Sequence, residues 1–203
     1  MAETRVITVG RQFGSCGRAI AKKLAENLGV AFYDKELIGL AAERGGLHPD
    51  AAKEADQKPA SAWLYAVPGE ALNAGYMNVK PINDTLFDAQ CQVIKELAEH
   101  SDCVIVGRCA DYVLREHPHC KNIFVYAPLE TRTKIIADRF SLSEREARNL
   151  IRRTDKQRKY YYNYYTDGHW GEMENYHVCF DSGEFGIDRT AEILCQMFQC
   201  MKK

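Results

Sequence analysis

Apolar runs of strand length alternate along this chain with segments of helical periodicity. Strands and helices that alternate in this way form βαβ units, in which the strands are parallel and helices cover the sheet. The pattern predicts five strands, over residues 5–9, 30–33, 103–106, 122–126 and 176–181. It therefore favours an α/β fold with a mostly parallel sheet.

The first helix has the clearest periodicity. Ile20, Leu24 and Leu28 recur at every fourth position, the pattern of one buried helix face, and Gly29 follows as a stop signal. Further helices are predicted over residues 35–44, 84–100, 129–140 and 187–201.

Two regions interrupt this alternation. Residues 47–83 hold four of the six prolines and predict an inserted subdomain of short helices and loops. Residues 141–168 are first strongly charged and then strongly aromatic, and Ser143 with Glu146 forms a capping box at a helix start. We interpret residues 1–203 as a single domain with two insertions.

The formal net charge is 27 − 28 = −1, so no global positive field would hold the chain on nucleic acid or an anionic membrane. No stretch approaches eighteen consecutive apolar residues, and the first residues do not form a signal peptide, so we expect a cytoplasmic protein. The eight cysteines include no C-x-x-C pair and are expected to be free thiols; Cys16 is the one to test for reactivity.

A glycine-rich segment, residues 10–19, joins the first strand to the first helix. Such a turn forms an anion site, because glycines let the backbone N–H groups converge and the helix dipole favours negative charge. The segment is a degenerate version of G-x-x-x-x-G-K-[ST]. The predicted phosphate-binding residues are Gly14, Ser15, Cys16, Gly17, Arg18 and Ala19. A glycine-rich turn that opens an ordinary helix is the alternative.

Two departures from that motif bear on the chemistry. Arg18 takes the place of the lysine and can still neutralise phosphate charge, while Ala19 offers no hydroxyl to a magnesium ion. Mg²⁺ is therefore expected to be held through water, phosphate or other residues, and no protein metal ligand is predicted.

Charged residues follow two of the predicted strands, at the edge where parallel sheets bind ligands. Asp34 would orient an acceptor hydroxyl or a metal-bound water, or would cap the next helix. Arg108 suits a phosphate or carboxylate of the acceptor, or is a surface residue on a turn. Asp111 is a weaker candidate.

The predicted helix over residues 143–159 has seven basic and three acidic residues from position 144 onward. Arg152 and Asp155 lie on one stripe of it, with Arg158 one step beyond. A mobile lid that carries arginines would supply the cations that phosphoryl transfer needs. A solvated helix face is the alternative.

Residues 160–165, directly after these basic residues, are mostly tyrosines. They would pack the lid helix onto the core or wall a nucleobase pocket; stacking on single-stranded nucleic acid is another hypothesis. His117 and His119 are interpreted as surface residues rather than metal ligands.

Taken in order, residues 9–18, 32–34, 104–113, 155–158, 161–171 and 176–182 resemble the cytidylate kinase-like family, relatives of bacterial cytidylate kinase within the P-loop nucleoside monophosphate kinases. The resemblance implies a three-layer α/β/α fold of the P-loop NTPase type with a five-stranded parallel sheet. It also implies an acceptor-binding insertion over residues 43–83 and a lid over residues 139–168.

By the same resemblance, residues 14–19 would hold the donor phosphates and Arg108 would face the acceptor. Arg152, Asp155 and Arg158 would close on the phosphates of donor and acceptor. The chain departs from cytidylate kinases at Arg18, where they have lysine, and at residues 106–109, where they read Asp-Gly-Arg-Asp and this chain reads Val-Gly-Arg-Cys.

The resulting hypothesis is a phosphotransferase that uses ATP or another NTP with Mg²⁺ and acts on a small acceptor, a nucleoside monophosphate (CMP-like) as first guess. Small-molecule nucleotides are the expected partners, not nucleic acid or membranes, and the sequence assigns no oligomeric state. The catalytic candidates are Arg18, Asp34, Arg152 and Arg158, and the acceptor-binding candidates are Arg108 and Asp155. A nucleotide-binding regulatory module without catalysis is the alternative.

Overall fold

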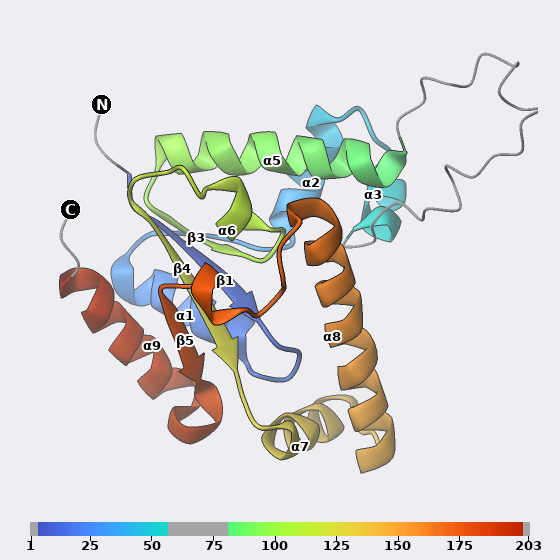
Figure 1. The fold of residues 1–203 in the computed structure, drawn as a ribbon, viewed down its shortest axis with the longest axis vertical. Coiled ribbons are helices and arrows are strands. Elements are labelled where there is room, and N and C mark those ends of the chain that lie inside the picture. The colour runs from blue at the N-terminus through green and yellow to red at the C-terminus, as the bar shows by residue number, and fades with distance from the viewer. Residues whose placement is uncertain (1–3, 57–80, 201–203) are drawn as a thin grey trace, which may run out of the picture.

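The computed structural model describes residues 4–56 and 81–200, and its centre is a five-stranded parallel sheet. The strand order is β2-β3-β1-β4-β5, and every neighbouring pair is parallel; Figure 1 shows β1, β4 and β5 side by side. The strands are β1 (Val6–Arg11), β2 (Ala31–Tyr33), β3 (Cys103–Val106), β4 (Cys120–Tyr126) and β5 (Val178–Asp181). The predicted fold class is confirmed.

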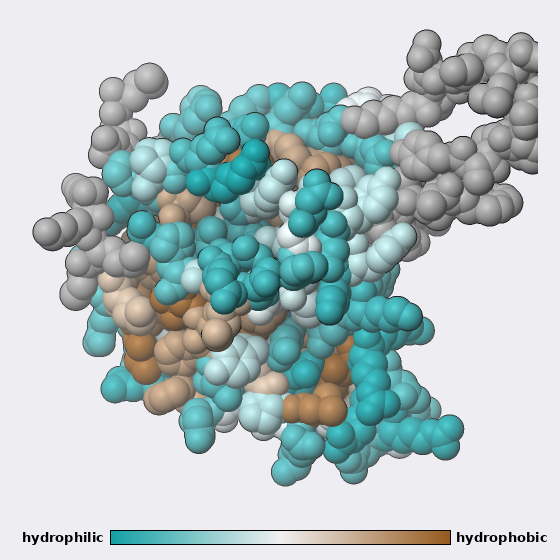
Figure 2. All heavy atoms as spheres, in the orientation of Figure 1, coloured by the Kyte–Doolittle hydropathy of each residue, from teal (hydrophilic) through white to brown (hydrophobic). Residues whose placement is uncertain are grey.

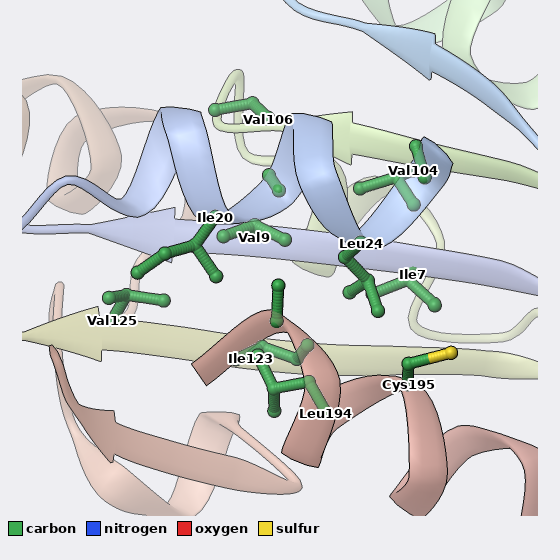
Figure 3. Packing of buried hydrophobic residues seen from close by; sticks show 13 residues of the cluster. Ile7, Val9, Ile20, Leu24, Val104, Val106, Ile123, Val125, Leu194 and Cys195 are labelled. Atoms are coloured by element: carbon green, nitrogen blue, oxygen red, sulfur yellow. The ribbon is translucent and has the colours of Figure 1, made fainter. Parts of the chain in front are cut away.

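Helices cover both faces of the sheet. The helices are α1 (Gly17–Leu28), α2 (Glu36–Arg44), α3 (Pro49–Ala55), α5 (Ile82–His100), α6 (Ala110–Val113), α7 (Leu129–Phe140), α8 (Glu144–Thr166) and α9 (Ser182–Cys200). On one face, α1 and α9 pack against β1, β3 and β4; Figure 3 shows Ile20, Leu24 and Leu194 among the side chains of these strands. On the other face, α5 and α6 bury Val93, Ile94 and Val113 against β3.

The predicted boundaries differ from the observed ones at functional positions. β1 runs to Arg11 instead of ending at Val9, because Gly10 and Arg11 continue the ladder opposite Phe124 and Val125. The helix predicted to end at 159 continues as α8 to Thr166. α9 spans Ser182–Cys200, but Gly186 has non-helical backbone angles (φ 71°) and divides it into two helical segments, the second of which begins at residue 187, as predicted.

The two predicted insertions are described to different extents. Of residues 43–83, the structure describes α3 and the ends of α2 and α5, and positions 57–80 lie outside the described residues. The predicted lid is the end of α7 together with α8, which packs on α7 through Ile136, Ala147 and Ile151. Among the described helices, each is too short or too polar to cross a bilayer. The seven cysteines whose side chains are described are free thiols, as predicted.

Replacing Leu194 by alanine removes a side chain that is 1% exposed between α9, α1 and the sheet. We expect the free energy of unfolding to fall by about 2–5 kcal/mol, because the cavity does not fully collapse. Met197→Ala, on the same helix but 39% exposed, should change it by less than about 1 kcal/mol. Urea-induced unfolding measures both, and equal losses would contradict the burial of this face of α9.

Candidate active site

The turn between β1 and α1 has the geometry of an anion-binding loop. Gly14 has φ of +86° and Cys16 has φ of 57°, both in the left-handed region. The first N–H groups of α1, from Gly17 onward, have no partner within the helix, and the helix dipole places partial positive charge there. The predicted phosphate-binding segment therefore presents backbone donors at the carboxyl edge of the sheet.

Two serine hydroxyl groups hold this loop in place through hydrogen bonds to backbone carbonyls. Ser15 Oγ donates to the carbonyls of Gln12 at 2.9 Å and Val125 at 3.0 Å, so the hydroxyl of this predicted phosphate ligand is turned into the protein. Ser182 Oγ, at the start of α9, donates to the carbonyls of Ser15 at 2.7 Å and Tyr126 at 3.0 Å. Sequence reasoning missed Ser182, whose partner lies 167 residues away.

Arg18 reaches across the loop to the end of β2. Its Nε lies 2.5 Å from Oδ2 of Asp34, whose side chain is 4% exposed, while that of Arg18 is 53% exposed. The helix-cap interpretation of Asp34 is wrong, because Lys35 is the N-cap of α2 and no side chain caps that helix. Two predicted site residues are thus in direct contact, and Asp34 orients Arg18.

Arg108 occupies a strained turn at the end of β3. Gly107, Arg108 and Cys109 have φ of 72°, 58° and 54°, three consecutive residues in the left-handed region. Such strain in residues other than glycine clusters at functional sites. The Arg108 side chain is 2% exposed and pairs with Asp56 at 2.9 Å, so the interpretation as a surface arginine is wrong. Its Nε and Nη1 are buried without a hydrogen-bond partner among the described residues.

Arg11, which sequence reasoning missed, lies between these two turns. A Cβ on Gly17 would lie 2.6 Å from Arg11 Cβ, and a Cβ on Gly107 would lie 2.3 Å from Arg11 Nη1. Gly17 is therefore required where the base of the Arg11 side chain passes it, whereas at Gly107 the flexible end of Arg11 could shift and the positive φ of 72° is what favours glycine. Burial, together with repulsion from Arg158 and Arg108, lowers the pKa of the Arg11 guanidinium well below its usual value.

Asp155 on α8 connects the lid helix to the loop. Its Oδ1 accepts the N–H of Phe13 at 2.7 Å, and its Oδ2 pairs with Arg132 Nη1 at 2.7 Å. Arg132 of α7, also missed from the sequence, donates to the carbonyls of Phe13 and Ala127. In this structure Asp155 is thus bound to the loop rather than facing the space for an acceptor.

The predicted stripe on α8 does not act as one unit. Arg158 turns inward and its Nη1 donates to the carbonyl of Arg11 at 3.0 Å. Arg152 is exposed and lies outside the cleft, and Arg148 pairs with Glu144 at 2.8 Å. Figure 2 shows a largely hydrophilic surface over α8, so its outer face is solvated, whereas Asp155 and Arg158 form hydrogen bonds with the loop.

These elements line an open cleft of about 360 Å³ above the loop. Among the described residues, six cationic side chains and two carboxylates line it, and both carboxylates are already paired with arginines. The lining residues with charge are Arg11, Arg18, Lys35, Arg108, Arg139 and Arg158, with Asp34 and Asp56. A cleft with this surplus of positive charge is built for a polyanion.

A smaller pocket of about 30 Å³ shares Arg11, Arg108 and Arg158 with the cleft, and its other walls include aromatic rings. Tyr161 and Tyr162 are buried there, and Tyr165 stacks on Phe87 of α5 at 4.0 Å between ring centres. The tyrosines therefore pack the lid helix onto the core, as predicted. Asp111 is buried and accepts the hydroxyl of Tyr162 at 2.8 Å, and burial raises the pKa of its carboxyl group.

Comparisons with known proteins agree with this geometry. The model of the cytidylate kinase-like family matches residues 6–184. No curated protein matches the chain significantly. Among solved structures, an uncharacterized protein from Eubacterium ventriosum ATCC 27560 is 26% identical, with a TM-score of 0.73 over 98% of this chain and 100% of its own.

Two shikimate kinases share the fold at lower identity. The enzyme from Bacteroides thetaiotaomicron is 14% identical, with a TM-score of 0.55 over 96% of this chain and 98% of its own. The enzyme from Acinetobacter baumannii, solved in complex with shikimate, is 15% identical, with a TM-score of 0.51 over 99% and 97%.

Replacing Asp155 by alanine should release the loop from the lid helix. Its carboxylate is 17% exposed and its loss leaves the buried Arg132 without its ion pair, so we expect the free energy of unfolding to fall by about 3 kcal/mol. Hydrogen exchange should also accelerate at the Phe13 amide. Glu144→Ala breaks an ion pair that is 71% exposed at its carboxylate and should change stability by at most about 1 kcal/mol. Unchanged exchange at Phe13 in Asp155→Ala would contradict the coupling.

Proposed function

The chain belongs to the cytidylate kinase-like family, and from this premise we propose that it transfers the γ-phosphoryl group of ATP or another NTP to a small acceptor. A nucleoside monophosphate is the first acceptor to test. The fold is shared with kinases whose acceptor is the small molecule shikimate, so phosphorylated and hydroxyl-bearing metabolites belong in the same test.

The observation that carries the proposal is the cationic cleft over the loop. Its surplus positive charge lies where the backbone N–H groups of the loop and the first turn of α1 converge. Phosphoryl transfer proceeds through a state whose charge is spread over phosphoryl oxygens, so catalysis consists mainly of positioning and electrostatic stabilisation. Donors and cations fixed in advance perform that task.

In this proposal the predicted site residues take distinct roles. The amides of residues 14–19 hold the donor phosphates, with Arg18 and Arg158 on the phosphoryl group that moves. Arg108 faces the acceptor, and Asp34 orients Arg18 or the attacking oxygen. Asp155 positions the loop through Phe13. Arg152 would contact phosphates only after α8 moves toward the cleft, since it is exposed in this structure.

The cleft fits a magnesium ion that arrives with the nucleotide. Ala19 has no hydroxyl, and the described residues contain no group of three or more metal-ligating side chains. Mg²⁺ commonly keeps several waters and is held by phosphates with one or two carboxylates. Asp34, which is buried at the cleft, is the side chain that would hold one of those waters. The ion would neutralise phosphate charge.

A nucleotide-binding regulatory module is the second candidate. It is favoured by the ion pair between Arg18 and Asp34, which engages the cation of the loop, and by the missing hydroxyl at position 19. This candidate predicts nucleotide binding without turnover.

Arg18→Ala tests the enzyme directly. With ATP, Mg²⁺ and a suitable acceptor, the unmodified chain should form ADP, and the variant should lose at least about 10²-fold in rate, because one positioned cation of the transition state is removed. Lys22→Ala is the matched control. Lys22 lies on the same helix, its side chain is 61% exposed, and it forms an ion pair with Glu26 at 3.8 Å.

A screen of nucleoside monophosphates and metabolites, coupled to ADP detection, measures this activity, and calorimetry measures nucleotide binding. Binding without turnover for every acceptor would select the regulatory module. No binding of any NTP would overturn both candidates.

A further inference from the structure

Gln90 is a fully buried amide on α5. It is 0% exposed and lies on the helix face that also carries the buried Leu86, Val93 and Ile94. A buried amide is unfavourable unless both its oxygen and its nitrogen find hydrogen-bond partners. Gln90 has a partner at each end, and the two partners belong to different elements of the fold.

The two ends of this amide contact the lid helix and the end of α3. Tyr161 of α8, which is itself buried, donates its hydroxyl to Gln90 Oε1 at 3.2 Å. Gln90 Nε2 lies 3.4 Å from Oδ1 of Asp56, the residue that follows α3. Because the hydroxyl donor fixes the oxygen end of the amide, the contact with Tyr161 determines that the nitrogen faces the carboxylate.

The other oxygen of Asp56 holds Arg108. Oδ2 pairs with Arg108 Nη2 at 2.9 Å, and this is the one ion pair of Arg108 among the described residues. The Arg108 side chain is 2% exposed, and its Nε and Nη1 have no hydrogen-bond partner in the described part of the chain. The contact with Asp56 therefore sets the direction of the guanidinium group and leaves two of its nitrogens for a ligand.

Asp56 must be ionised to hold Arg108 in this way. Burial raises the pKa of its carboxyl group, and the charge of Asp34 adds to the rise. Arg108, the hydrogen bond from Gln90 and the charge of Arg11 act in the opposite direction and favour the ionised form. Since burial outweighs them, the loss of any one of these three contacts brings the carboxyl group closer to protonation.

We propose that Gln90 is a positioning residue of the active site: it orients the Asp56 carboxylate, and that carboxylate directs Arg108. Tyr161 holds Gln90 in the required orientation. Gln90 is not among the residues that line the cleft or the smaller pocket, so it acts through Asp56. The role of Arg108 toward the acceptor rests on the proposed function, whereas the chain of contacts from Gln90 to Arg108 does not.

Gln90→Met tests this proposal, because methionine keeps the length of the side chain but cannot donate to Asp56. In carbon-detected NMR titrations the pKa of the Asp56 carboxyl group should rise by about one pH unit, the effect of one hydrogen bond to a charged group. The Arg108 Nε–H signal should move as well. Gln92→Met is the matched control, since Gln92 is exposed on the same helix and should leave both signals unchanged.

Asp56→Asn separates a positioning role from a merely structural one. This variant removes the carboxylate, so adding Gln90→Met to it should not move the Arg108 signal any further. Further movement would show that Gln90 acts on Arg108 by another route and would overturn the proposal. An unchanged titration of Asp56 in folded Gln90→Met would overturn it as well.

Thermal unfolding shows whether Gln90→Met folds. If it does not, Tyr161→Phe keeps the aromatic ring and removes the hydroxyl that holds the Gln90 amide. The pKa of Asp56 should then rise by a smaller amount, about half a pH unit, because Gln90 is no longer held toward it. A titration of Asp56 identical to that of the unmodified chain would refute the proposal.

Once a screen has identified an acceptor, kinetics test the link to the proposed function. Gln90→Met should raise the KM of the acceptor at least about threefold and leave the KM of ATP unchanged. As the pH falls, Asp56 takes a proton and releases Arg108, so the rise in acceptor KM should begin about one pH unit higher in the variant. Equal changes in both KM values would refute the positioning of Arg108 for the acceptor.

The failure of this proposal and that of the proposed function are distinguishable, because the NMR measurements need no substrate. The expected shifts without turnover of any acceptor would support the positioning role and refute the phosphotransferase. Turnover without those shifts would leave the phosphotransferase standing and refute the role of Gln90.

Discussion

The structure depends on holding several positive charges close together at one edge of its sheet. In the part of the chain that the structure describes, six cationic side chains line the cleft, and the two carboxylates beside them are bound to Arg18 and Arg108. Like charges in a partly desolvated space repel, so the surrounding framework must fix them. Buried side chains on both faces of the sheet supply that framework. Two local features of this framework are the strained turn over residues 107–109 and the glycines beside Arg11.

The lid helix belongs to this framework rather than lying over it. Asp155 and Arg158 are three residues apart, hence on neighbouring positions of one helix face. Asp155 accepts the N–H of Phe13, and Arg158 donates to the carbonyl of Arg11. α8 is therefore hydrogen-bonded to two places in the same turn. Any movement of α8 therefore changes the loop and the position of Arg158 together. If the loop binds a nucleotide as proposed, this coupling would make nucleotide binding and movement of α8 depend on each other.

The fold was largely predictable from the sequence, because strand and helix patterns and the glycine-rich turn are local signals. The positions of Asp34 and Arg108 at the carboxyl edge followed from the strands they succeed. Arg11 could not be found in this way, since the strand was expected to end at Val9 and extends two residues further because β4 pairs with it. The sequence analysis also did not predict Asp56, Arg132 and Ser182 as site residues, because their partners are distant in sequence.

The helical stripe on α8 shows the limit of periodicity. Spacing placed Arg152, Asp155 and Arg158 near one another, but it could not say which of them would meet a neighbouring element. Packing of α8 on α7 decides this: it turns Asp155 toward Arg132 and leaves Arg152 in solvent. The role of a charged residue on this helix therefore depends on its contacts with neighbouring elements, and the spacing of residues along one helix does not specify those contacts.

In the proposed function, the ion pair between Arg18 and Asp34 would link the binding of donor and acceptor. Arg18 is half exposed, so the free energy that its side chain loses on leaving Asp34 is small. A triphosphate would offer it stronger charge-assisted hydrogen bonds. Asp34 is 4% exposed, however, and a buried carboxylate without a donor is strongly unfavourable. A hydroxyl group or an ordered water must therefore replace Arg18 as Arg18 turns to the phosphates. Under the proposed function, full engagement of the donor would thus require that the acceptor, or water carried with the nucleotide, reach Asp34 at the same time.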